Sequence, residues 1–361
     1  MKTLQRQGKK FNGCTIGLDL HLAFIQFVVF DKKGNEVAGG QVAFKREALE
    51  KFLKPWQARG AVQVSFEACG CFVWVFELAV KLLGREQVHA AHAGKLRVIA
   101  QSMEKNDHND AWWLGYFLYE GRLPHAYVAE GQLRELRIAG RELRSYTDRR
   151  SDLIRRVRSS LFQLGQKLPK GWHTSKLKRE LTWQVIESVA DLRGEALRDL
   201  YAEIERLTVT IMKWRKEVER LCEAVPEVQA MISELPGMKA VVGGLIYGEM
   251  GPAGRFRNEK AYAKGTGLTP GRRISAGKGQ AVSITREGSR LARWALTRAV
   301  LACMRCNKGP GAQVKKWVLK QVARQKAKRK VIVAAARKMA EGVWRLVSRG
   351  ESFDLRRAFP A

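Results

Sequence analysis

The order of apolar runs in the first third of the chain restricts the folds that it can adopt. The pattern predicts strands over residues 15–20, 24–30 and 36–44, with a hairpin turn at 31–35. After these come a helix over 46–58, a strand over 61–67, an apolar helix over 72–83, a short strand at 88–91, and helices from Leu96 and from Asn109. This β-β-β-α-β-α-β-α order predicts a domain built on one mixed sheet.

Four acidic residues fall at the ends of these predicted elements. Asp19 lies in the first strand, Glu67 ends the fourth, and Asp107 and Asp110 stand three apart near the start of the last helix. A carboxylate at the end of a buried strand is unfavourable unless it binds a metal or a partner. A carboxylate pair at i and i+3 points to one face of a helix.

The element order is ribonuclease-H-like, and in such a fold these acids converge at one edge of the sheet. An isolated Asp in a strand is more often paired or capped than catalytic, but four acids in this topology favour a metal-dependent nuclease. Carboxylate oxygens suit the hard cations Mg²⁺ or Mn²⁺. The six histidines show no spacing typical of a metal site, and we read Cys303-Met304-Arg305-Cys306 as helix packing rather than half of a zinc site.

The charge of the chain indicates a polyanionic partner. Lys and Arg number 66 against 35 Asp and Glu, which gives a net charge of +31 and favours nucleic acid. No apolar run approaches the roughly 20 residues that a membrane-spanning helix needs, and the first residues lack the apolar core of a signal peptide. Because the six cysteines are scattered, we expect a cytoplasmic protein with reduced thiols and no membrane.

The middle of the chain is helical and charged. Leucines from Leu133 to Leu164 predict one long amphipathic helix, and apolar residues from Leu197 to Leu221 alternate steps of three and four. Such a stripe is typical of a coiled-coil seam. Either it pairs with the preceding long helix within the chain or it is a dimerisation arm, and both can hold. Residues 167–178 are predicted to be the connecting loop.

A third, mostly helical region begins near Pro226. Residues 233–241 have the form of a helix-hairpin-helix turn, in which backbone amides around Gly237 and Lys239 meet a phosphate. Residues 271–279 are predicted to be a loop, and basic helices with apolar faces follow from Arg286. The predicted division is therefore 13–125 for the nuclease domain, 126–225 for the helical region and 226–350 for the C-terminal domain.

Five motifs together resemble one family. They are Gly17-Leu18-Asp19, Glu67-Ala68-Cys69-Gly70, Lys105-Asn106-Asp107 with Asp110-Ala111, Leu235-Pro236-Gly237-Met238, and Gly267-Leu268-Thr269-Pro270 followed by Ser275. In this order they are similar to the DEDD transposases of bacterial insertion sequences (the IS-one-ten and IS-eleven-eleven type), described as RNA-guided recombinases. The resemblance implies a RuvC-like N-terminal domain, a coiled-coil region and a C-terminal transposase domain with a catalytic serine.

The resemblance maps that serine to Ser275. The family usually has Ser-Gly here, whereas Ala276 stands between Ser275 and Gly277 in this chain, so Ser283 and Ser289 are the other candidates. The resemblance also implies a site in which Mg²⁺ (or Mn²⁺) is held by Asp19, Glu67, Asp107 and Asp110. Two ions about 3.5–4 Å apart stabilise the attacking and leaving oxygens in such centres.

The implied partners are donor and target DNA, a structured noncoding guide RNA and further copies of the chain. We expect a dimer, a tetramer in the synaptic complex, a site composed between subunits and a location at the bacterial nucleoid. The residues expected to contact nucleic acid are Lys105, Gly237, Lys239, Arg272, Arg273, Lys278 and Arg293. Two other functions stay open: a RuvC-like hydrolytic junction nuclease in which Ser275 is structural, and a non-enzymatic scaffold that binds RNA or DNA.

Overall fold

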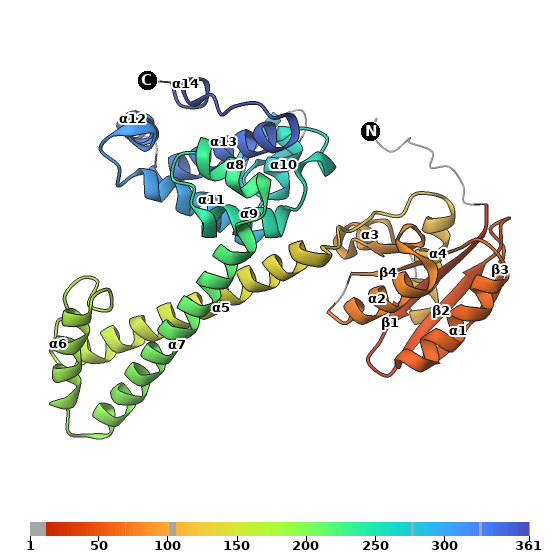
Figure 1. Ribbon diagram of the computed structural model, residues 1–361, viewed down its shortest axis with the longest axis horizontal. Helices are drawn as coiled ribbons and strands as arrows, with labels where there is room; N and C mark the ends of the chain where they lie inside the picture. The colour runs from red at the N-terminus through yellow and green to blue at the C-terminus, as the bar shows by residue number, and fades with distance from the viewer. Residues whose placement is uncertain (1–11, 69, 101–105, 276–277, 325–326, 361) are drawn as a thin grey trace. The chain divides into compact units, whose positions relative to one another are not determined.

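The chain forms two compact units, residues 1–128 and 129–361. The computed structural model describes residues 12–68, 70–100, 106–275, 278–324 and 327–360. Figure 1 colours the first unit from red to gold and the second from yellow through green to blue. Within the described ranges, every helix is too short or too polar to cross a membrane.

The first unit is built on a five-stranded mixed sheet of order β3-β2-β1-β4-β5. The central strand β1 pairs antiparallel with β2, which pairs antiparallel with β3. On its other side β1 runs parallel to β4, and β4 runs parallel to β5. The strands are β1 (Cys14–Leu20), β2 (Phe24–Phe30), β3 (Glu36–Ala43), β4 (Val62–Glu67) and β5 (Val88–Ala91). This α/β arrangement with one mixed sheet is the one that the sequence predicts.

Helices cover both faces of this sheet. They are α1 (Arg46–Ala58), α2 (Phe72–Leu83), the short 3₁₀ turn η1 (Arg85–Gln87), α3 (Ala93–Ala100) and α4 (Asp107–Tyr119). The buried side chains of Ile16, Leu18, Val64 and Phe66 share one core with residues of α1 and α2. Because side chains alternate along a strand, Gly17 and Asp19 face the opposite side, where α4 lies.

Two glycines let α4 rest directly on β1. A Cβ atom added to Gly17 would lie 1.9 Å from the carbonyl oxygen of Ala111 and 2.4 Å from the amide nitrogen of Gly115. A Cβ on Gly115 would in turn lie 3.0 Å from the amide nitrogen of Gly17. The buried hydroxyl of Thr15 donates a hydrogen bond to the carbonyl oxygen of Gly115 at 3.1 Å. The strand and the helix therefore pack backbone against backbone, which leaves no space for a methyl group.

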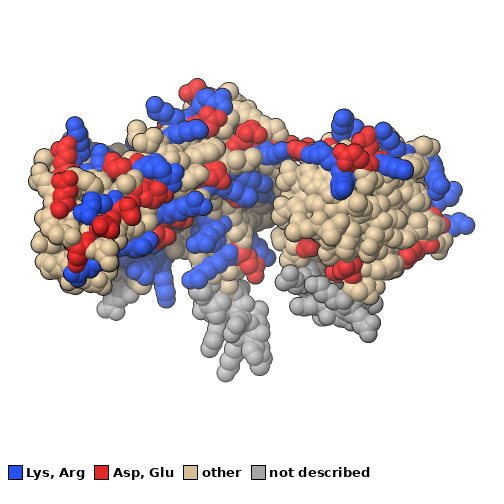
Figure 2. Space-filling view, turned by 90° about the horizontal axis from the view of Figure 1, so that it is seen from below, with Lys and Arg blue, Asp and Glu red and all other residues tan. Residues whose placement is uncertain are grey.

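The long helices of the second unit pair within the chain. Helix α5 (Gly131–Gln163) packs along α7 (Leu192–Cys222), and α6 (Lys176–Glu187) lies near their far ends (Figure 1). That end has a core of its own, formed by Val157, Leu161, Trp172, Ile186, Leu197, Tyr201 and Ile204. Figure 2 shows Lys and Arg interspersed with Asp and Glu on the face that it draws.

Two predicted loops are wrong in part. Residues 176–178 already belong to α6, whose first turn is capped because Ser175 accepts a hydrogen bond from the amide of Lys178. Residues 271–275 and 278–279 belong to two paired strands, β6 (Pro270–Ser275) and β7 (Lys278–Ile284), and not to a loop. Its glycines and arginines suggest a loop, whereas the strand pairing depends on a register with residues up to Ile284 that local composition does not reveal.

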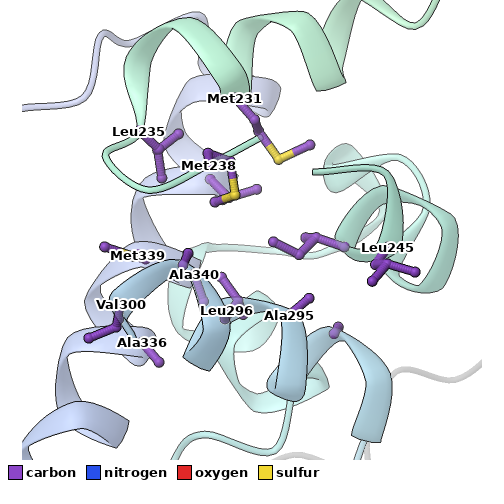
Figure 3. Packing of buried hydrophobic residues seen from close by; sticks show 14 of the residues in the cluster. Met231, Leu235, Met238, Leu245, Ala295, Leu296, Val300, Ala336, Met339 and Ala340 are labelled. Atoms are coloured by element: carbon purple, nitrogen blue, oxygen red, sulfur yellow. The ribbon is translucent and has the colours of Figure 1, made fainter. Parts of the chain in front are cut away.

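The remaining helices of the second unit surround one apolar core (Figure 3). They are α8 (Pro226–Glu234), α9 (Ala240–Met250), the short 3₁₀ turn η2 (Ala253–Arg255), α10 (Glu259–Gly265), α11 (Arg290–Cys303), α12 (Gly309–Ala323), α13 (Lys328–Arg349) and α14 (Leu355–Ala358). Met231 and Met238 point into this core from the region of the α8–α9 turn, opposite Leu296 of α11 and Met339 of α13.

The α8–α9 turn needs a glycine because it packs on α11. Gly237 has a φ of 75°, and a Cβ there would lie 2.3 Å from the carbonyl oxygen of Ala299 and 2.8 Å from the sulfur of Cys303. Packing thus accounts for the Leu-Pro-Gly-Met motif, and the phosphate contacts expected of Gly237 and Lys239 stay predictions. Cys303 is fully buried.

Substitution of Gly17 by alanine is expected to weaken the packing of α4 on β1. The methyl group would overlap backbone atoms of α4, so we expect a local loss of about 3 kcal/mol. Hydrogen–deuterium exchange of the full-length protein should show faster exchange for peptides from β1 and α4. Gly94→Ala is the matched control, because the nearest atom to an added Cβ is 3.5 Å away on the His92 side chain. Unchanged exchange in Gly17→Ala would contradict the close approach.

Candidate metal centre and nucleic-acid interface

The topology of the sheet places Asp19 and Glu67 at the same edge. Leu18 of β1 is the register partner of Phe66 in the parallel strand β4. Asp19 and Glu67 are the next residues on the two strands, so both lie at the carboxyl edge and on the face opposite the Leu18 and Phe66 core. This is the convergence that the sequence predicts for these two acids.

The start of α4 brings the other two acids to this edge. The helix begins at Asp107, and the side chain of Asn106 caps it by accepting a hydrogen bond from the amide of Asn109 at 2.7 Å. Asp107 and Asp110 both lie in the first turn. Since α4 crosses β1 at Gly17, two residues before Asp19, this turn lies close to the Asp19 carboxylate.

The electrostatics of Asp19 are those of a crowded acidic site. Burial raises the pKa of Asp19, His21 lowers it through its charge and a hydrogen bond, and the nearby Asp110 and Asp107 raise it again. Only 15% of the Asp19 side chain is exposed. A divalent cation would relieve both the burial of this carboxylate and its repulsion by the two acids of α4.

A histidine that the sequence analysis missed lies beside Asp19 and Asp107. His21 Nε2 lies 2.8 Å from Asp19 Oδ2 and 3.5 Å from Asp107 Oδ1. One donor atom from each of Asp19, His21 and Asp107 lies within 4.8 Å of the others. The sequence analysis found no metal-site spacing among the histidines and so did not identify His21. The sequence does indicate that His21 lies near Asp19, because it follows Asp19 by two residues and so faces the same way. Sequence spacing does not reveal its contact with Asp107 of α4.

The candidate nucleophile lies in the second unit. Ser275 ends β6 and is the register partner of Lys278, while Arg272 and Arg273 pair with Ala281 and Gln280. The side chains of residues 272–283, which include Ser283, lie outside the described part of the structure, as does Lys105. The backbone thus carries Ser275, Arg272, Arg273 and Lys278 on one short hairpin.

Arg293 supports the turn that leads into this hairpin. Its Nη1 donates hydrogen bonds to the carbonyl oxygens of Thr266 at 2.9 Å and Arg286 at 3.4 Å. Gly267 has a φ of 69°, and a Cβ there would lie 2.3 Å from Arg293 Nη1. The Arg293 guanidinium therefore supports the Gly-Leu-Thr-Pro motif. The sequence analysis had assigned Arg293 only to nucleic-acid contact.

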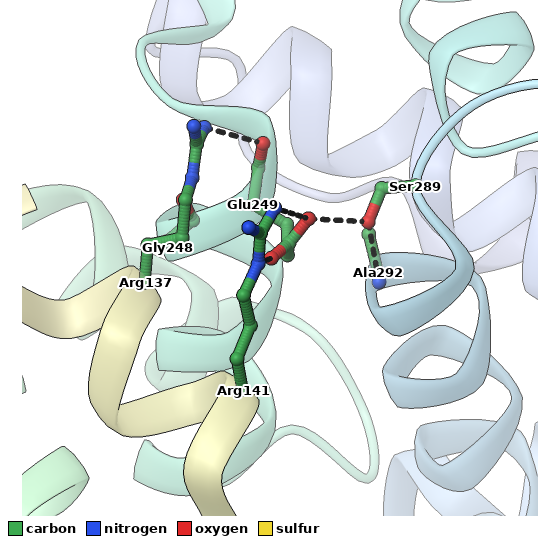
Figure 4. Close-up of polar contacts among 6 residues, drawn as sticks. All are labelled: Arg137, Arg141, Gly248, Glu249, Ser289 and Ala292. Carbon is green, nitrogen blue, oxygen red and sulfur yellow. Dashed lines mark hydrogen bonds and ion pairs between the residues drawn. The ribbon is translucent and has the colours of Figure 1, made fainter. Parts of the chain in front are cut away.

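A buried carboxylate joins α5, α9 and α11 (Figure 4). Glu249 Oε1 accepts a hydrogen bond from Arg141 Nε at 2.7 Å, and Glu249 Oε2 accepts one from the Ser289 hydroxyl at 2.9 Å. Ser289 in turn caps α11 by accepting from the amide of Ala292 at 3.1 Å. Arg137 donates to the carbonyl oxygen of Gly248 at 2.8 Å. These bonds give Ser289 a structural role as a helix cap.

Beside this joint lies an arginine-rich cleft of about 1070 Å³. The guanidinium of Arg144 lies 4.2 Å from the ring centroid of Trp294. Burial lowers the pKa of Arg144, Asp148 partly offsets this, and Arg290 and Arg298 lower it further. Guanidinium groups crowded in this way suit phosphate oxygens, which accept their hydrogen bonds and neutralise their repulsion. The arginines that line this cleft are Arg141, Arg144, Arg286, Arg290 and Arg293.

Comparison with known proteins matches both units. Residues 16–165 match the family model of IS110-type DEDD transposases, and residues 229–315 match the model described as "Transposase IS116/IS110/IS902 family". The first match contains all four acids, and the second contains the Leu-Pro-Gly-Met turn and Ser275.

Two curated relatives are also similar. The chain is 25% identical over 171 residues to the putative transposase y4pF/y4sB of Sinorhizobium fredii, an alignment that covers 47% of this chain and 42% of the relative. It is 23% identical over 207 residues to the transposase for insertion sequence element IS1111A of Coxiella burnetii, an alignment that covers 56% of this chain and 56% of the relative. The chain thus spans about half the length of the curated relatives that it matches. From these matches, the chain belongs to the IS110-type DEDD transposases.

Proposed function

We propose that this protein is a DNA transposase that cuts and rejoins the strands of an insertion sequence under the guidance of a structured noncoding RNA. The observation that carries the proposal is the cluster at the carboxyl edge of the sheet, where Asp19 lies beside His21 and Asp107. An acidic site of this kind in a chain of this family supports metal-dependent chemistry on phosphodiesters.

In the proposed mechanism, Asp19, Glu67, Asp107 and Asp110 hold the divalent ion, Mg²⁺ or Mn²⁺. When bound, the ion would neutralise charge at the scissile phosphate and lower the pKa of an attacking hydroxyl. Ser275 Oγ would attack phosphorus and form a phosphoserine ester, while the bond from phosphorus to the leaving strand breaks. The proton released by Ser275 balances the one that the leaving oxygen takes up as that strand departs as a hydroxyl. The ester conserves the bond energy for joining to a second DNA end.

The basic residues of the second unit would bind the nucleic acids. We assign phosphate contacts to Arg272, Arg273 and Lys278 of the hairpin, and further contacts to the arginine-rich cleft described above. Lys105, Gly237 and Lys239 stay proposed contacts, and Arg293 would act through the turn that it supports. Base pairing of the guide RNA would supply sequence specificity, so that the protein need only bind shape and phosphate.

Assembly of the site would involve more than one copy of the chain. On α7, Val209 is 69% and Met212 is 55% exposed, which supports a dimerisation arm in addition to the pairing with α5. We propose a dimer, with a tetramer in the synaptic complex, in which the Ser275 hairpin of one subunit reaches the acids of another. The functional regions would be residues 13–125, 126–225 and 226–350.

Replacement of Asp19 by asparagine is expected to reduce DNA strand cleavage on the order of 100-fold or more. The change keeps the shape of the side chain but removes a metal-binding charge, so binding of DNA and RNA should persist. Chelation of divalent ions should have the same effect on the wild-type protein. Glu47→Gln is the control, because it removes an exposed charge from α1 of the same unit. Cleavage at the wild-type rate in Asp19→Asn would exclude the proposed centre.

Denaturing electrophoresis of a reaction with labelled DNA should reveal a strand that stays covalently attached to the protein. The attached strand should be absent in Ser275→Ala and present in Ser283→Ala, which removes a hydroxyl from the paired strand β7. If the attached strand is absent only in Ser283→Ala, the nucleophile is Ser283 and not Ser275. Metal-dependent nicks without any attached strand would instead indicate a hydrolytic nuclease.

Sequencing of RNA that copurifies with the full-length protein tests guidance by RNA. We expect strong enrichment of a single structured transcript from DNA that flanks the gene for this protein, since a guide must match its own element. A protein of equal expression and similar positive charge serves as the control for nonspecific retention. Recovery of the same indiscriminate cellular RNA from both proteins would argue against guidance.

A further inference from the structure

We propose that His21 is a nitrogen ligand of the divalent ion held by Asp19 and Asp107, and that it gives this centre a preference for Mn²⁺ over Mg²⁺. The inference rests on the proposed metal-dependent function and names a residue outside the four acids. It concerns which ion the site selects.

The spacing of the donor atoms fits a single ion. Metal–ligand distances of about 2.1 Å place neighbouring ligands of an octahedral ion roughly 3 Å apart. His21 Nε2 is 2.8 Å from Asp19 Oδ2 and 3.5 Å from Asp107 Oδ1. The imidazole therefore lies between the two carboxylates in the position of a third ligand.

The fold holds this imidazole in place before an ion arrives. His21 follows β1 at the turn into β2, where its amide donates a hydrogen bond to the carbonyl oxygen of Phe24 at 3.0 Å. The ring packs against the Phe24 ring with centroids 4.8 Å apart. Leu22, at the tip of the same turn, is 85% exposed, whereas only 36% of the His21 side chain is exposed. The backbone and Phe24 together keep the ring turned toward Asp19.

The combination of one imidazole nitrogen with carboxylate oxygens determines the preference for Mn²⁺ over Mg²⁺. Mg²⁺ requires near-ideal octahedral geometry and binds oxygen ligands and water. Mn²⁺ also prefers carboxylates and water, but as a first-row transition metal it accepts a nitrogen donor more readily than Mg²⁺ does. One nitrogen beside two or more carboxylates therefore favours Mn²⁺, while a site made of oxygen atoms alone discriminates less.

Pulsed electron paramagnetic resonance of Mn²⁺ bound to the full-length protein tests the ligand directly. The wild-type spectrum should contain the ¹⁴N coupling of a coordinated imidazole, and His21→Gln should lack it. Calorimetric titration should show that His21→Gln weakens Mn²⁺ binding by about tenfold and Mg²⁺ binding by much less. Absence of the ¹⁴N coupling in the wild type, or equal weakening for both ions, would overturn the proposal and leave His21 as a hydrogen-bond partner of Asp19.

His108→Gln is the matched control. This histidine is adjacent to Asp107 on α4, but its Nε2 lies 3.0 Å from Glu36 Oε1 and it is outside the cluster. It should keep both the ¹⁴N coupling and the Mn²⁺ affinity. If these are lost in His108→Gln and kept in His21→Gln, the proposed ligand is wrong.

Asp19→Asn separates this proposal from the function on which it rests. If wild-type Mn²⁺ binding depends on Asp19 but carries no ¹⁴N coupling, only the role of His21 fails. If Mn²⁺ binding is the same in the wild type and in Asp19→Asn, the metal centre itself fails, and the proposed function fails with it.

Discussion

The contact between Gly17 of β1 and α4 is the constraint on which the candidate centre depends. Because neither Gly17 nor Gly115 has a side chain, the helix backbone lies against the strand backbone. This close approach, together with the Thr15 hydrogen bond, places the first turn of α4 beside the end of β1. A larger residue at Gly17 would move Asp107 and Asp110 away from Asp19. The glycine in Gly17-Leu18-Asp19 thus has a geometric role distinct from that of the acid.

The centre combines like charges that are unfavourable without a cation. Burial of Asp19 and the proximity of Asp107 and Asp110 oppose its ionised form, and His21 offsets this only in part. Replacing a buried ion pair by well-packed apolar residues is often neutral or stabilising, so such a pair is weak evidence for a purely stabilising role. We therefore interpret the His21 imidazole and the carboxylates beside it as ligands of the proposed ion rather than as a stabilising ion pair.

The second unit is organised by a different polar element. Glu249 links Arg141 of α5 to Ser289 at the start of α11, and it is 8% exposed. The arginine-rich cleft lies beside this joint and is lined by Arg141 and Arg144, so α5 also contributes to the basic surface. Arg293 illustrates why basic residues cannot all be assigned to nucleic acid, since its guanidinium is bound to backbone carbonyl groups of the Gly267 turn.

The sequence by itself determined the element order of the first unit, the edge at which Asp19 and Glu67 lie, and the two long helices. These follow from hydrophobic periodicity, which is local and strong. Only the tertiary structure decided that His21 meets Asp107, that residues 270–275 pair with 278–284, and that Ser289 and Arg293 support the fold. Each of these depends on contacts between segments far apart or on strand register, and neither composition nor spacing records which distant backbone a side chain meets.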